Sequence, residues 1–120
     1  MEGTKERIVK NDDYTQVKST DERGPGGAYH DYEVNCNRDL NGTCAKIGFQ
    51  KGAILENGVN GCTQEDLLEI VRDRLQCFQS GPFPCSYNAE ALQCVNGALD
   101  ALNRRTQDRR NRNVEGKTTA

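Results

Sequence analysis

The sequence predicts an α+β protein, in which a small antiparallel sheet is followed by a C-terminal antiparallel two-helix hairpin. Residues 29–62 contain short runs of alternating apolar residues separated by Asn-Gly turns, which is typical of antiparallel strands. Residues 63–78 and 86–102 instead carry apolar residues three and four positions apart, as amphipathic helices do. Gly81 and two prolines separate these two helical segments, so the chain must reverse between them.

The apolar residues are few and unevenly placed. Leu, Ile, Val and Phe supply 22 of 120 residues, and 16 of those 22 lie in residues 47–102. The formal net charge is only −2, so charge repulsion gives no reason for disorder. We therefore expect one domain with a thin core that favours self-association. Its parts are a polar N-terminal segment (1–28), a sheet (29–62), a helical hairpin (63–112) and a tail (113–120).

The N-terminal segment has two candidate edge strands, Arg7–Lys10 and Tyr14–Val17, and then a glycine-rich turn at residues 24–27. No Gly-Lys-Ser/Thr follows, so a phosphate loop is not predicted. In the sheet, Tyr29–Val34 and Thr43–Gln50 are expected to pair across a turn at Asn41-Gly42. Gly52–Glu56 is predicted to form a third strand.

Capping residues and apolar stripes define the two helices. Thr63 can cap the first helix, and Glu65 and Asp66 suit the positive end of its dipole. Ser86 is expected to cap the second helix. The stripes consist of Leu67, Val71, Leu75 and Phe78 in the first helix, and of Leu92, Val95, Leu99 and Leu102 in the second. The predicted lengths are about 16 and 25 residues, so the second helix overshoots by roughly 13 Å.

Neither a membrane span nor a secretory signal is expected. No apolar run approaches the ~20 residues of a spanning helix, and the N-terminus lacks a basic start followed by an apolar stretch. We therefore expect a cytoplasmic protein with free, mostly buried thiols, without metal or cofactor. The six cysteines have no C-x-x-C spacing, and His30 is the single histidine; the cysteines are Cys36, Cys44, Cys62, Cys77, Cys85 and Cys94. Catalysis is not predicted, since no nucleophile–base pair or paired carboxylates stand out.

The overshooting end of the second helix is strongly basic. Residues 104–112 carry five arginines and one acid, whereas residues 1–103 carry 10 basic and 16 acidic residues. Such arginines either lie on a solvated face that complements the helix dipole or bind an anion. A short basic patch on an otherwise acidic chain suits a compact phosphorylated ligand better than a nucleic acid. A nucleic-acid-binding or regulatory hairpin protein remains the alternative.

The link between the helices is rich in aromatic residues, namely Phe78, Phe83 and Tyr87. These residues either cap the local core or stack on a base. Aromatic rings and phosphate-binding arginines together would recognise a nucleotide, but in one hairpin they lie roughly 25 Å apart. Nucleotide binding would therefore require an oligomer.

Several segments resemble one family of phage and prophage proteins. They are Phe49–Ile54, Gly58–Gly61, Leu67-Leu68, Asp73–Leu75, Phe78–Cys85, Asn88-Ala89, Ala91-Leu92, Arg105-Thr106, Asp108-Arg109 and Val114–Gly116. The chain resembles the Thoeris anti-defence sponges of the first kind, whose hairpin is shared with the anti-CBASS nucleotide sponge. The resemblance covers roughly residues 29–117.

The resemblance implies a protein that binds a cyclic ADP-ribose signal without cleaving it, so that the effector stays inactive. Hexamers are implied, and so is binding of cyclic di- and trinucleotides by some members. The family site lies between protomers and combines an aromatic ring, an asparagine and phosphate-gripping arginines. Those roles fall on Phe78 or Phe83, on Asn88, and on Arg105 or Arg109. The family's basic residue from the sheet would be Lys46 or Lys51, or Arg74 would serve instead.

Overall fold

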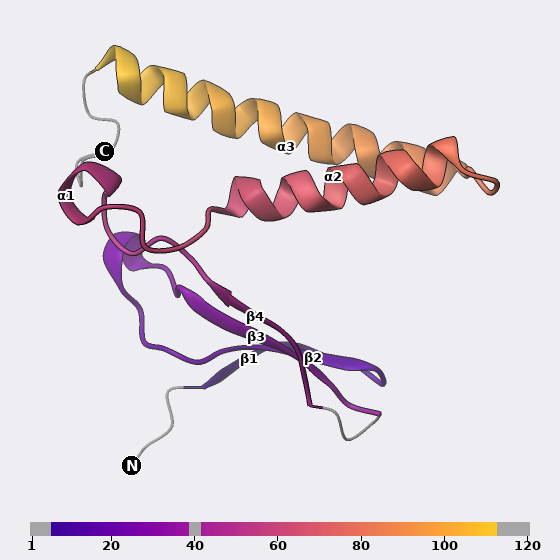
Figure 1. The fold of residues 1–120 in the computed structure, drawn as a ribbon, viewed down its shortest axis with the longest axis horizontal. Helices are drawn as coiled ribbons and strands as arrows, with labels where there is room; N and C mark the ends of the chain where they lie inside the picture. Colours follow the sequence, from indigo (N-terminus) through magenta and orange to yellow (C-terminus); the bar gives the residue numbers. More distant parts are fainter. Residues whose placement is uncertain (1–5, 39–41, 113–120) are drawn as a thin grey trace. The chain divides into compact units, whose positions relative to one another are not determined.

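The computed structural model describes residues 6–38 and 42–112, which form two compact units (Figure 1). The first unit, Met1–Cys62, contains the sheet, and the second, Thr63–Ala120, contains the two long helices. This arrangement confirms the predicted fold class, an antiparallel sheet followed by a helical hairpin.

The sheet is a four-stranded antiparallel meander. Its strands follow the chain in the order β1 (Arg7–Asn11), β2 (Thr15–Ser19), β3 (Asp31–Cys36) and β4 (Thr43–Gly48). Both candidate segments of the N-terminal part form strands, and β1 is an edge strand, as expected. The prediction that the second is also an edge strand is wrong, because β2 pairs with β1 on one side and with β3 on the other. The predicted turn at Asn41-Gly42 lies partly outside the described residues.

The turn between β1 and β2 is organised by one carboxylate. Asp12 Oδ1 accepts hydrogen bonds from the backbone amides of Tyr14 (2.8 Å) and Thr15 (2.9 Å). Lys10 Nζ lies 2.8 Å from Asp12 Oδ2 and also donates to Thr15 Oγ1. An aspartate that bonds the backbone a few residues ahead fixes a tight reversal, so this turn holds the register of the first hairpin.

The predicted third strand is wrong. Ile54–Asn57 instead forms α1, a single helical turn in which the amides of Glu56 and Asn57 donate to the Ala53 carbonyl. Gly52 and Gly58 flank it with φ angles of +77° and +72°, a left-handed backbone that ends any extended run. Because the backbone groups find partners within the turn, no neighbouring strand is needed.

The loop around α1 is closed by two side chains. Gln50 Nε2 donates to the carbonyls of Gly52 and Gly58, while Gln50 Oε1 accepts from the Asn60 amide. Asn60 in turn bonds both backbone groups of Lys51. Gly61 lies so close to Phe49 that an added Cβ would be 2.5 Å from its carbonyl carbon, which only glycine permits.

Burial is sparse in both units. Among the described residues no hydrophobic side chain is buried, and the two buried residues are Ser19 and His30. The prediction of mostly buried thiols is wrong, because the six cysteines are exposed or half-buried. The strands and helices are too few to enclose them.

The second unit is a hairpin of α2 (Gln64–Ser80) and α3 (Ser86–Asn111), close to the predicted lengths. The Asp66 amide donates to Thr63 Oγ1 at 3.2 Å and the Thr63 amide donates to the Asp66 carboxylate at 2.9 Å, which is a reciprocal capping box. The α3 cap differs from the prediction. Cys85, not Ser86, is the N-cap residue, and its Sγ accepts from the Asn88 amide at 3.4 Å.

The two helices run side by side in opposite directions from their short link (Figure 1). Arg72 Nη1 reaches across to Asn96 Oδ1 at 3.5 Å, and Arg72 also pairs with Glu69 on its own helix. No helix in the described part of the chain is long and apolar enough to cross a membrane.

Candidate functional site

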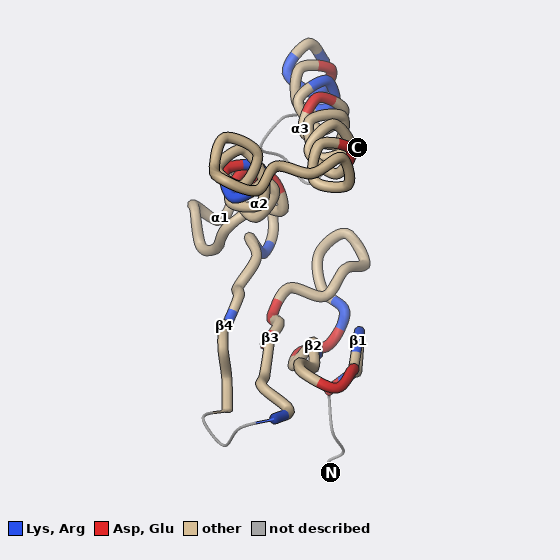
Figure 2. Tube along the Cα trace, turned by 90° about the vertical axis from the view of Figure 1, so that its right-hand side faces the viewer, with Lys and Arg blue, Asp and Glu red and all other residues tan. Residues whose placement is uncertain are grey.

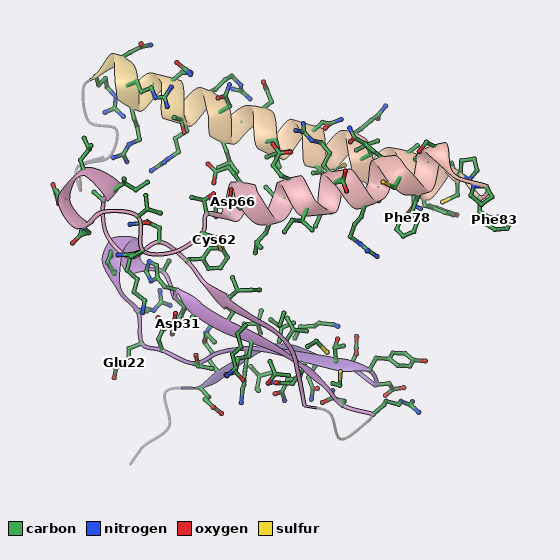
Figure 3. All side chains as sticks on the ribbon, in the orientation of Figure 1. Glu22, Asp31, Cys62, Asp66, Phe78 and Phe83 are labelled. Atoms are coloured by element: carbon green, nitrogen blue, oxygen red, sulfur yellow. The ribbon has the colours of Figure 1, made fainter. Side chains whose placement is uncertain are left out.

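The link end of the hairpin exposes two aromatic rings. Phe78 lies in the last turns of α2 and is 49% exposed, and Phe83 lies in the link and is 85% exposed. Figure 3 shows both rings at this end of the hairpin. The link is fastened by Gln79, whose Oε1 accepts a hydrogen bond from the Cys85 amide at 3.0 Å. The chain therefore holds two apolar rings in solvent on an ordered reversal.

Phe78 has a cation on its ring. The guanidinium carbon of Arg74 is 5.3 Å from the ring centroid, within the range of a cation–π contact. The two residues are four positions apart on α2, so they occupy one face of the helix. Two of the predicted site residues are thus in contact.

Asn88 lies in the first turn of α3, close in sequence to the link. Its backbone amide donates a hydrogen bond to Cys85 Sγ, and the residue is half-buried. The amide side chain has no hydrogen bond within the described part of the chain, so it can still bond a ligand. Phe78, Phe83 and Asn88 therefore belong to one end of the hairpin.

The opposite end of α3 carries the arginines (Figure 2). Arg104 pairs with Asp100 and Arg112 with Asp108, both at 3.0 Å and both within the helix. Arg105 is exposed and has no ion pair within residues 6–38 and 42–112. Arg109 is half-buried. At this end of α3, Arg104 and Arg112 are neutralised by acids of the same helix, while Arg105 can still bind an external anion.

One chain does not bring these two groups together. Asn88 and Arg105 lie 17 residues apart on a continuous helix, so their backbones are separated by about 25 Å. The candidate basic residues of the sheet differ from each other. Lys51 pairs with Asp31 at 3.0 Å, whereas Lys46 is exposed on β4. In a single hairpin, the aromatic residues and the arginines of the predicted site lie at opposite ends.

Two hollows lie along the hairpin between its ends. One is an open apolar hollow of about 570 Å³, lined by Gln64, Leu67, Leu68, Ala98, Ala101 and Leu102. The other is a polar groove of about 420 Å³, which includes Glu69, Arg72, Asn96 and Asp100. The hairpin therefore has an apolar side left open to solvent.

Sequence reasoning missed two features of this site. The contact of Arg74 with Phe78 could have been found from the four-residue spacing on a predicted helix. The Cys85 cap had no such signal, because Cys is not a favoured capping residue.

The described residues contain no cluster of His, Cys, Asp and Glu that could hold a metal ion.

Comparison with known proteins places the hairpin in a family. The family model described as "Acb2/Tad1, hairpin domain" matches residues 44–107. A curated relative, "Thoeris anti-defense 1" of Bacillus phage SBSphiJ7, is 44% identical over 79 residues. That match covers 66% of this chain and 56% of the relative's length.

Proposed function

The chain belongs to the Acb2/Tad1 hairpin family, and we propose that it is a phage anti-defence protein that sequesters cyclic ADP-ribose-type immune signals. Bound signal would be withheld from its effector, which would then stay inactive. Cyclic di- and trinucleotides share the same phosphate and base chemistry and belong to the same proposal. The name of the phage relative supports the anti-defence role.

One observation carries this proposal: the hairpin has exposed rings at one end and arginines at the other. A nucleotide signal has a base and phosphates. The exposed Phe78 ring offers a stacking surface, and the Asn88 amide can hydrogen-bond a base edge or ribose. Arg105 and Arg109 supply forked donors that match phosphate oxygens.

The proposed site needs a second copy of the chain. Two hairpins packed antiparallel would put the link of one beside the arginines of the other, closing the separation of about 25 Å. Two-fold symmetry would then form two equal sites per pair. The open apolar hollow at Leu67, Leu68 and Ala98 supports such packing, because a partner would cover it. Hexamers built from such pairs are the proposed assembly.

The proposed action is binding, not turnover. The proposed contacts are an aromatic ring, an amide and guanidinium groups. None of these side chains is a usual general base at neutral pH. Signal captured by the protein should therefore be recoverable unchanged.

Capture and release tests the proposal directly. The purified protein is mixed with the cyclic product of a bacterial TIR-domain enzyme, unbound product is removed, and the protein is then denatured. Intact product in the released fraction is the expected result. A cleaved product would reveal an enzyme, and no product would refute sequestration. A size measurement on the same sample reports the assembly.

The alternative, a nucleic-acid-binding hairpin, is favoured only by the basic end of α3. Two of its arginines are already neutralised by acids on the same helix. A gel shift that persists at high salt would support this alternative, because non-specific phosphate contacts weaken steeply as salt rises.

A further inference from the structure

Two arginines from separate segments of the sheet unit contact one tyrosine ring. The guanidinium carbon of Arg7, at the start of β1, is 4.1 Å from the centroid of the Tyr29 ring. The guanidinium carbon of Arg23, just before the glycine-rich turn η1 (Pro25–Gly27), is 5.2 Å from the same centroid. A single ring therefore gathers two positive charges.

Neighbouring contacts fix the backbone around this ring. Arg23 Nη1 donates to the Gly27 carbonyl at 2.9 Å, which anchors the guanidinium to the turn. Arg7 is opposite Ser19 in the β1–β2 register, and Ser19 is fully buried. Tyr29 precedes His30, which is 6% exposed and whose backbone amide donates to the Asp21 carboxylate. The two arginines are thus presented by ordered segments.

The other cations of the sheet unit differ from these two. In residues 6–38 and 42–62, four basic residues each lie within 4.0 Å of a carboxylate, the pairs being Lys10–Asp12, Lys18–Glu6, Arg38–Asp13 and Lys51–Asp31. Arg7 and Arg23 have no ion pair within these described residues, although the unit is rich in acids. In these described residues, three cations therefore have no ion pair. Two of them, Arg7 and Arg23, lie at the Tyr29 ring, and the third is Lys46 on β4.

Both guanidiniums lie by one ring, so a ligand with two phosphoryl groups can place one group against each of them. Each guanidinium is a planar fork of donors that matches two oxygens of a phosphoryl group. Both guanidiniums lie over the Tyr29 ring, so the site offers charge and hydrogen bonds rather than a free surface for a base. We propose that Arg7, Arg23 and Tyr29 form a second anion site, which binds the phosphoryl groups of a small phosphorylated ligand.

This inference is independent of the proposed function. Arg7 lies in β1, and Arg23 and Tyr29 lie in the connection between β2 and β3, outside residues 44–107 that the family model matches. They also lie outside the hairpin that would take the immune signal. Phosphoryl binding at Arg7 and Arg23 and signal binding at the hairpin can therefore be measured separately, and the loss of one does not decide the other.

Residue-resolved NMR of the isotope-labelled full chain tests the proposal, with inorganic pyrophosphate as the probe. Saturable shifts are expected at the amides of residues 23–29 and at the Nε–H groups of Arg7 and Arg23. ADP is expected to move the same signals through its diphosphate, and adenosine is expected to move none of them. Because pyrophosphate can also meet the arginines of α3, the affected residues must be identified individually.

Substitutions complete the test. Arg7→Gln and Arg23→Gln are each expected to weaken pyrophosphate binding on the order of tenfold, since each removes charge-assisted hydrogen bonds. Arg23→Lys should restore part of the loss. The matched control is Arg38→Gln, because Arg38 also stacks on a tyrosine, with 5.1 Å to the Tyr14 centroid, but pairs with Asp13. Arg38→Gln should leave binding unchanged.

Three results would overturn the proposal. Shifts confined to α3 would mean that the sheet has no anion site. An equal loss in Arg38→Gln would mean that only the net charge matters. Shifts with adenosine would mean that a base, not a phosphoryl group, occupies the ring. Unchanged amide dispersion in β2 and β3 checks that each variant is folded.

Discussion

Arg74 covers Phe78: its guanidinium carbon is 5.3 Å from the centroid of a ring that is still 49% exposed. The contact occupies part of the ring surface and leaves the remainder open. A base that stacks on Phe78 would then form a layered arrangement of base, ring and guanidinium. This relationship separates Phe78 from Phe83, which is more exposed and has no cation on its ring within the described residues.

Phe78→Ala should weaken capture of a cyclic ADP-ribose signal. Stacking of one base on an aromatic side chain contributes about 1–3 kcal/mol, so a loss of roughly fivefold to 150-fold is expected. Calorimetric titration measures it. Phe83→Ala is the matched control and should change the affinity by less than about twofold. A larger loss in Phe83→Ala would identify the link ring as the stacking surface instead.

Arg74→Gln should have a smaller effect. An exposed cation–π contact contributes about 0.5–1 kcal/mol, so removing it should weaken ligand binding about twofold to fivefold by loosening the ring. The same titration measures this change, and Arg74→Lys should retain part of the affinity. A loss far beyond fivefold would show that Arg74 contacts the phosphates directly.

Mixing two weakened variants tests whether the site is shared between copies. At a signal concentration below the dissociation constants of both variants, Phe78→Ala and Arg109→Ala should each capture little signal alone. After unfolding together and refolding, half of the pairs would be mixed, and each mixed pair would contain one intact site. About a quarter of the wild-type capacity should therefore return. The measurement is the amount of intact signal released per protomer.

The control for this experiment is the same mixture made without the unfolding step, in which exchange of subunits is limited. If Phe78 and Arg109 of one chain served the same site, no mixture would regain capture. That outcome would refute the shared site, because every chain would still carry one defect.

Ala98→Glu should disrupt the assembly. Ala98 lines the apolar hollow with Leu67 and Leu68, and a carboxylate there would be buried without a partner on association. Light scattering should report a smaller particle, with helix content retained by circular dichroism. Gln93→Glu, on an exposed position of the same helix, is the charge-matched control and should leave the particle size unchanged.

The hairpin was predictable from sequence because its signals are local. The Thr63 cap, the apolar stripe that begins at Leu67 and the break at Gly81 all act within a few residues. The segment Gly52–Glu56 was mispredicted for the opposite reason. A strand needs a partner, and here the side chains of Gln50 and Asn60 close the segment into a loop that satisfies its own backbone.

The candidate site was predictable only as a set of residue types. The sequence separates Phe78 from Arg109 by about 30 positions, and the helix geometry alone implies that one chain cannot join them. Which ring is covered depends on side-chain rotamers, as the contact of Arg74 with Phe78 illustrates. The stack of Arg7 and Arg23 on Tyr29 joins three segments and has no local signal at all.

The stability of the sheet should depend on pH through Asp12. Hydrogen bonding from the Lys10 side chain, and then from the amides of Thr15 and Tyr14, holds the pKa of Asp12 well below its usual value. Since the unfolded chain has the ordinary pKa of about 3.9, ionised Asp12 stabilises the folded state fully above that value. The contribution is lost as the pH falls through the lower folded-state pKa.

Asp12→Asn isolates this effect, because asparagine keeps the oxygen that accepts the two amide bonds but cannot form the ion pair with Lys10. The urea midpoint of the wild type should exceed that of Asp12→Asn near pH 7, and the difference should shrink as the pH falls from about 5 to about 2. Asp13→Asn is the matched control, since Asp13 pairs with Arg38 at a longer 3.7 Å. It should lower the midpoint less near neutral pH. A constant difference between wild type and Asp12→Asn across the whole range would mean that the carboxylate charge does not stabilise the turn.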